Sequence, residues 1–395
     1  MRVIAALCVL CISLFALASV AGENGTSLET RGAAVEDSVE RNLWLVRAPI
    51  RDRKGAVVSG LTASDFRVSV DGVHWPIEYV DEICPESTWF PSSHTGPMQA
   101  SMMSSEIVEQ AFKDERSYLS LYFDLGAMRL PSIRRAAAAA EQWLNLDTST
   151  HAKMDSSVSI VAQSGGALYE VAPFTDDRSI LQSAIGIVGS GKIIQDPFPA
   201  FLSSRVRECG SSGATCLAFA KEEKRHNENT LGILERYIAG LERYHGRKTL
   251  VYFHETTTLF PSRLYSGSCS LAFKVGDNVS LAERLAGIAT ANNMVIHVAY
   301  SGSRVGSHGS STGGALDDHA VNFGANLADY SGGKYNRGPG DLVSLLRGAA
   351  QGECFYQFAL AVPKGFQEKE GTYRVVIRPK RPGVKRNLRY TVNGD

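Results

Sequence analysis

The chain has 395 residues, of which 44% are hydrophobic, so it can bury one large core or two to three smaller ones and is not a disordered protein. Lys and Arg together number 41, as do Asp and Glu, and the formal net charge is therefore zero. Because no long block of like charge appears, nucleic acid is not expected among the partners.

The first residues have the pattern of a secretory signal. Arg2 precedes an apolar run over residues 3–18, and Ser19-Val20-Ala21 offers small residues for cleavage. We therefore predict a signal peptide at residues 1–21, a mature chain that is secreted or periplasmic, and no membrane span after cleavage. The alternative is an uncleaved amino-terminal anchor, because the apolar run is just long enough to span a membrane.

Export also bears on the cysteines. Five remain in the predicted mature chain: Cys84, Cys209, Cys216, Cys269 and Cys354. Disulfides are expected in an oxidising compartment, and one thiol of an odd set is left over. The flexible loop between Cys209 and Cys216 could close easily, so we predict a bridge there. Metal ligation is the alternative, but no His/Cys cluster of zinc spacing accompanies this pair.

The chain begins with β pattern. Residues 22–80 are predicted to form an N-terminal β module, because apolar and polar residues alternate at 43–50, 66–72 and 75–80 around tight turns. Residues 81–116 are rich in Ser, Pro, Met and acidic residues without sustained periodicity, which indicates a linker.

From residue 117 to residue 352 strands alternate with helical patterns, which is typical of parallel β-α-β units. Strands are predicted at residues 118–124, 157–163, 167–174, 248–255 and 294–300, with a short one around Lys334. Helices are predicted at residues 131–144, 178–188, 230–244, 281–292, 317–330 and 341–351. A Ser-Gly-Gly turn makes the second and third strands a hairpin. Residues 189–226 are predicted to be a long irregular insertion.

The C-terminal segment, residues 353–395, returns to β pattern at 355–362, 373–379 and 388–392. The predicted fold class is therefore α/β: a doubly wound, mostly parallel sheet flanked by N- and C-terminal β segments that form one β-sandwich. Two independent small β modules are the alternative.

Several short motifs occur in a fixed order along the mature chain. They are Val46 to Gly72, Pro173-Phe-Thr-Asp-Asp-Arg178, Gly246-Arg-Lys-Thr-Leu-Val251, Tyr330-Ser-Gly-Gly333 and Val375 to Gly383. Their order resembles the VWFA-related family of acidobacterial type, and residues 117–352 look like a von Willebrand factor A domain. The resemblance covers nearly all of the mature chain. It implies a sheet whose site lies where strand order reverses.

The resemblance also implies a divalent metal site built from an Asp-x-Ser-x-Ser run, a threonine and a second aspartate. Here Asp124-Leu-Gly126-Ala-Met128 keeps the aspartate and loses both serines, and a thioether is a poor ligand for Mg²⁺ or Ca²⁺. Glu255 stands where the second aspartate is expected, and Thr230 is the nearest threonine. We predict a degenerate site that binds no cofactor, or only weak Mg²⁺ or Ca²⁺. The alternative is that Asp124 only ends a strand or pairs with a cation.

Catalytic patterns are missing from the sequence. Neither a nucleophile motif nor a phosphate loop is found, so we predict that the protein is not an enzyme. The main hypothesis is an exported binding protein whose A-type domain engages a protein or glycan ligand. Its binding face would include Gly126, Met128 and His254, framed by the insertion and the loop 301–314. The alternatives are a structural envelope-assembly module that binds through its β-sandwich, and a hydrolase.

Overall fold

The computed structural model describes residues 43–52, 58–83, 117–146, 156–193, 204–205, 208–209, 213–261, 265, 274–302, 322–336, 338, 341–351, 354–363, 365–366, 372–384 and 388–393. All of them belong to one compact unit, Arg41–Asp395. The predicted signal peptide, most of the predicted linker and most of the loop 301–314 lie outside the described residues. Among the helices of the described part, none is long and apolar enough to span a membrane.

A six-stranded sheet forms the centre of the α/β part, in the order β10-β9-β8-β5-β6-β7. Its strands are β5 (Ser117–Asp124), β6 (Ser156–Ser164), β7 (Ala167–Thr175), β8 (Arg247–His254), β9 (Met294–Tyr300) and β10 (Tyr335–Asn336). Only β7 runs antiparallel to its neighbour. This order, with a hairpin at the second and third strands, confirms the predicted doubly wound, von Willebrand A-like sheet.

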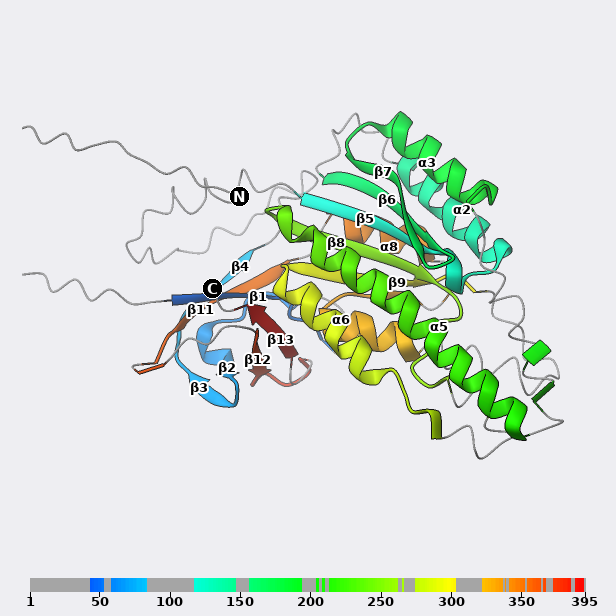
Figure 1. Ribbon diagram of the computed structural model, residues 1–395. Coiled ribbons are helices and arrows are strands. Elements are labelled where there is room, and N and C mark those ends of the chain that lie inside the picture. Colours follow the sequence, from blue (N-terminus) through cyan, green and yellow to red (C-terminus); the bar gives the residue numbers. More distant parts are fainter. Residues whose placement is uncertain are drawn as a thin grey trace, which may run out of the picture. The chain divides into compact units, whose positions relative to one another are not determined.

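The two faces of the sheet follow the alternation of side chains along β5. Leu119, Leu121 and Phe123 pack with α2 (Leu130–Leu146), α3 (Arg178–Ser190) and α8 (Leu342–Gln351). Tyr122 points to the other face, which is covered by α5 (Gly213–Gly240), α6 (Val279–Ala291) and the helix over residues 322–331. Figure 1 shows α5 crossing the sheet and continuing beyond its edge.

The remaining strands form a β-sandwich. One sheet has the order β1-β11-β4 and the other β13-β12-β2-β3. Their bounds are β1 (Leu43–Ala48), β2 (Phe66–Val70), β3 (Val73–Trp75), β4 (Ile77–Ile83), β11 (Phe355–Ala361), β12 (Thr372–Pro379) and β13 (Leu388–Asn393). Each sheet pairs N-terminal with C-terminal strands around one core, which contains Trp75 and Phe358. The prediction of one sandwich is confirmed, and the alternative of two independent modules is wrong.

The insertion differs from its prediction. Residues 189–226 were expected to be irregular, but α5 begins at Gly213 rather than at Thr230 and runs on to Gly240. The inward side of its added turns holds Cys216, Ala220, Glu223 and Asn227, all buried. Two of these four are polar, so the helical spacing is present but the apolar pattern that signals a helix is broken.

Candidate functional site

Asp124 ends the central strand β5 at the carboxyl edge of the sheet and is fully buried. Its Oδ2 atom accepts a hydrogen bond from the Tyr252 hydroxyl and lies 3.4 Å from Oγ1 of Thr257. Burial is the main cause that holds the pKa of Tyr252 well above its usual value, and the negative charge of Asp124 adds to it. The Tyr252 hydroxyl therefore keeps its proton. Asp124 is therefore hydrogen-bonded to strand β8 and to the loop that follows it.

Glu255, directly after β8, is paired with Arg129. Its Oε2 accepts from the backbone N–H of Arg129 at 2.8 Å, and its Oε1 accepts from Nε of the same residue at 2.8 Å and from one terminal nitrogen. The Glu255 side chain is 2% exposed, whereas that of Arg129 is 41% exposed. Charge-assisted hydrogen bonds of this kind are stronger than neutral ones. The second predicted metal carboxylate is thus neutralised by a protein cation.

Backbone contacts close the same end of the sheet. The carbonyl of Ala127 accepts from the backbone N–H groups of Glu255 at 3.1 Å and Thr256 at 2.9 Å. The carbonyl of Gly126 accepts from Nε2 of His226 on α5 at 3.0 Å. The loops after β5 and β8 are therefore joined to each other, and the insertion helix lies against them.

Gly126 and Met128 were predicted to belong to a binding face. Both are buried, and the Met128 side chain, 2% exposed, packs in the core with Leu125 and Phe253. Gly126 has no side chain and that of Met128 is buried, so neither presents a side chain at the surface of this end of the domain.

His254 is likewise a core residue, with an exposed fraction of 0%. Its ring stacks on Tyr252 at 5.3 Å and meets Phe323 edge-on at 5.6 Å. Burial lowers its pKa to about 3, so the ring is neutral. Neither ring nitrogen has a hydrogen-bond partner in the part of the chain that the structure describes. His254 was also predicted to belong to the binding face, and its ring is not exposed there.

Thr230 was the candidate threonine for the metal. It is buried on α5, while the described hydrogen bonds of Asp124 come from Tyr252 and Thr257. The signal for this contact was available in the sequence, because Thr256-Thr257-Thr258 follows strand β8 directly. Sequence reasoning missed Arg129 as well, although it lies just after Met128.

These contacts decide how well the residues fit a divalent cation. Hard cations are held by several oxygen ligands. Here each carboxylate receives N–H or O–H donors, and the positions of the two family serines hold no oxygen side chain. Among the described residues, no group of three or more His, Cys, Asp or Glu could hold a metal ion. The donor set fits Mg²⁺ or Ca²⁺ poorly, because Arg129 engages Glu255, Tyr252 engages Oδ2 of Asp124, and the two serine oxygens are missing.

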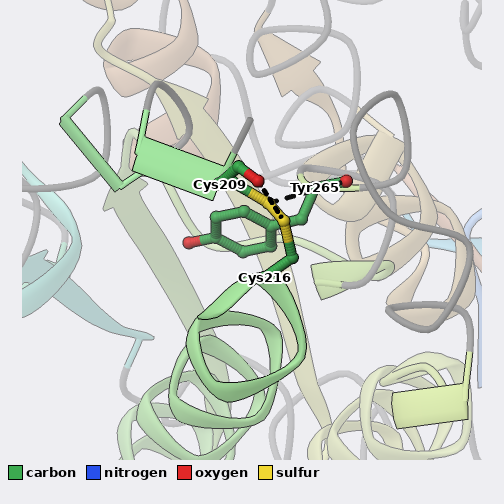
Figure 2. The surroundings of a disulfide bond; sticks show 3 residues. All are labelled: Cys209, Cys216 and Tyr265. Atoms are coloured by element: carbon green, nitrogen blue, oxygen red, sulfur yellow. Dashed lines mark hydrogen bonds between the residues drawn. A yellow bond between two sulfur atoms is a disulfide. The ribbon is translucent and has the colours of Figure 1, made fainter. Parts of the chain in front are cut away.

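The insertion contains the predicted disulfide. Cys209 and Cys216 are bonded, with their Cα atoms 4.7 Å apart, and both are buried. Figure 2 shows the bridge beside the ring of Tyr265. Cys354, just before β11, is also disulfide-bonded.

A buried glutamate lies on the inner side of α5 in the same insertion. Glu223 is 1% exposed, and its Oε1 accepts from Nδ2 of Asn227 at 3.4 Å. Its Oε2 has no hydrogen-bond partner within the described ranges, and the same holds for the buried Tyr265 hydroxyl. Burial raises the pKa of Glu223 to about 8, although the positive charge of Arg205 acts in the opposite direction. Sequence reasoning missed this group.

Comparisons with known proteins add little. No protein-family model matches the chain, and no curated protein matches it in sequence. Among solved structures, the pilus adhesin SpaC from Lactobacillus rhamnosus GG is similar over 71% of this chain and 44% of its own, with 8% identity and a TM-score of 0.33. The manganese-loaded Plasmodium vivax TRAP protein is similar over 80% and 96%, with 11% identity and a TM-score of 0.33.

The human COPII-coat protein Sec24c is similar over 71% of this chain and 44% of its own, with 9% identity and a TM-score of 0.30. This chain therefore spans less than half the length of SpaC and of Sec24c. The fold assignment rests on the strand order and pairing of the sheet.

Proposed function

We propose that the chain is an exported binding protein whose von Willebrand A-like domain engages a protein or glycan ligand without a metal ion and without catalysis. One observation carries the proposal: both carboxylates at the switch point of the sheet are bonded to protein donors. Asp124 receives the Tyr252 hydroxyl, and Glu255 receives the Arg129 guanidinium. Each carboxylate is thus engaged by a donor from the protein itself.

Arg129 is the charged residue of this site that reaches solvent. Its side chain is 41% exposed although it is bonded to the buried Glu255. Arginine remains charged at any physiological pH and can hold carboxylate or hydroxyl groups in its plane. A ligand contact at this end of the domain would therefore include Arg129 and the adjoining turns of α5 around His226.

A pull-down tests the proposal. The mature chain is immobilised and exposed to the extracellular and envelope fraction of its source, in EDTA and again in Mg²⁺. We expect the same partner in both conditions, because no metal is needed. Arg129→Gln should lose that partner. The matched control is Arg284→Gln, since Arg284 is a surface residue paired with Glu235. Retention that depends on Mg²⁺ would contradict the proposal.

The rival function, an envelope module that binds through the sandwich, has one observation in its favour. Apolar side chains are exposed on two edge strands: Val73 of β3 is 59% exposed, and Tyr79 of β4 is 37% exposed. Val73→Lys and Tyr79→Lys would abolish retention in that case, while Arg129→Gln would leave it unchanged. The pull-down therefore separates the two functions.

A further inference from the structure

Cys354, the residue before β11, forms a disulfide bond, and the sequence leaves few partners for it. Cys209 and Cys216 are bonded to each other, which removes both of them. The two cysteines of the predicted signal peptide are absent from a mature chain. Within one mature chain, the partner of Cys354 is therefore either Cys84 or Cys269.

The register of β4 and β11 favours Cys84. These strands are antiparallel, and five consecutive residue pairs, the last of them Phe355 with Ile83, follow one another without a shift. Cys354 directly precedes Phe355, and Cys84, which lies outside the described residues, directly follows Ile83. The next pair in the same register is therefore Cys354 with Cys84.

The spacing of such a pair suits a disulfide. Residues directly opposite each other in an antiparallel ladder have Cα atoms roughly 4.5 or 5.5 Å apart, depending on the kind of pair. Both distances fall within the roughly 4.4–6.8 Å that disulfides span. A bridge at this position would therefore need no displacement of either strand.

Cys269 belongs to another part of the fold. Tyr265, which precedes it in the same segment, packs in the small cluster of the insertion with Cys209 and Cys216. Strand β11, by contrast, lies in the sandwich, where its neighbours in the sheet are β1 and β4. The described contacts thus associate Cys269 with the insertion and Cys354 with the end of β4.

We infer that Cys84 and Cys354 form a disulfide across the ends of β4 and β11, and that Cys269 is left as the thiol of the mature chain. Forming the bond removes two protons and two electrons from the two thiols. A disulfide of the oxidising compartment accepts them by thiol–disulfide exchange and is itself reduced to two thiols.

This bond has a mechanical consequence. The chain leaves the sandwich after β4 and returns to it at β11, so the bond joins the two passages between the sandwich and the α/β part. The whole α/β part lies in the loop that the bond closes. The ends of β4 and β11 are thereby held together however the α/β part is folded or loaded by a partner.

Peptide mapping of the mature chain under non-reducing conditions tests the inference. Thiols are blocked with iodoacetamide in denaturant, and trypsin then places the cysteines on four separate peptides: 68–113 with Cys84, 208–221 with the insertion pair, 264–274 with Cys269, and 348–364 with Cys354. We expect 68–113 linked to 348–364, and 264–274 alkylated. A link from 348–364 to 264–274 or to a second copy of itself would overturn the inference.

Two serine variants give an independent check by the same mapping. In Cys84→Ser, Cys354 loses its partner and should be alkylated together with Cys269. Cys269→Ser is the matched control, in which the link between the other two cysteines should remain and no thiol should be alkylated. Alkylation of Cys354 in Cys269→Ser would show that Cys269 was its partner and would contradict the inference, even if Cys84→Ser does not fold.

Discussion

Two buried glutamates of the same domain are held in opposite ways. Glu255, 3% exposed, accepts from the backbone and side chain of Arg129, with two of these contacts at 2.8 Å. Glu223, 1% exposed, has one described contact, to Asn227 at 3.4 Å, and a pKa raised to about 8. Burial is nearly equal at the two positions, so the difference lies in the donors: a guanidinium and a backbone N–H contact Glu255, whereas a single amide contacts Glu223. The glutamate at the switch point is paired with a cation, and the one in the insertion has a pKa raised by burial.

The largest expected effect concerns Glu223. Its pKa is about 8 in the folded chain and 4.5 when unfolded, so between these pH values the folded state binds the extra proton. The stability that Glu223 contributes should therefore be fully present below pH 4.5 and should be lost as the pH rises through 8. The free energy of unfolding should fall by up to about 5 kcal/mol if the whole shift is realised. Urea unfolding at pH 5, 7 and 9 measures this loss.

Two variants sharpen that measurement. Glu223→Gln keeps the shape without the charge and should flatten the pH dependence. Glu228→Gln is the matched control, because Glu228 lies on the same helix, is 49% exposed and is paired with Lys224. Parallel pH curves for wild type and Glu223→Gln would show that Asn227, Arg205 and Tyr265 accommodate the charge after all.

The second prediction concerns the other glutamate, Glu255, and its pairing with Arg129. Arg129→Ala leaves Glu255 buried without its cation, which should lower the free energy of unfolding by about 2–3 kcal/mol, less than for a fully buried pair because Arg129 is partly exposed. Arg284→Ala removes a surface pair with Glu235 and should cost below about 1 kcal/mol. Equal effects in chemical denaturation would mean that the Arg129 pair is no stronger than a surface one.

The third prediction concerns the disulfide of the insertion. Replacing Cys209 and Cys216 together by serine should lower stability by about 2 kcal/mol, because the bridge closes only a short loop. The α/β sheet should stay folded, since the pair packs in a small cluster of its own with Ala220 and Tyr265. Loss of the whole far-ultraviolet dichroism signal in the double variant would be inconsistent with this separation.

The smallest effect is expected from metal. Adding Mg²⁺ or Ca²⁺, or removing them with EDTA, should leave the melting temperature unchanged within error, because Arg129 and Tyr252 already occupy the two carboxylates. Restoring oxygens with Gly126→Ser should not create an Mg²⁺ site in calorimetry while Arg129 is present. In an Arg129→Ala background Gly126→Ser should create one. Mg²⁺ binding by Gly126→Ser with Arg129 intact would contradict the view that Arg129 keeps a cation from Glu255.

Much of the fold could be predicted, because the buried strands appear in the sequence as runs of apolar residues and the turns are marked by glycines. The hairpin after β6 and the position of Asp124 and Glu255 at strand ends both follow from such local signals. The state of these two carboxylates did not follow, because the contacts of Arg129 and Tyr252 depend on loop conformation and on the register of neighbouring strands. The early start of α5 was missed for another reason: Glu223 and Asn227 occupy inward positions where apolar residues are expected.

Each sheet of the sandwich combines strands from the two ends of the chain, and this affects how the chain folds during synthesis. Strands β1, β2 and β4 find their partners β11 and β12 only after the whole α/β part has been synthesised. Until then their apolar side chains have no core, which exposes the young chain to aggregation. Prior folding of the α/β part would bring the two chain ends together and shorten the loop that must close. The N-terminal strands therefore gain their full sandwich core only once the C-terminal strands have been made.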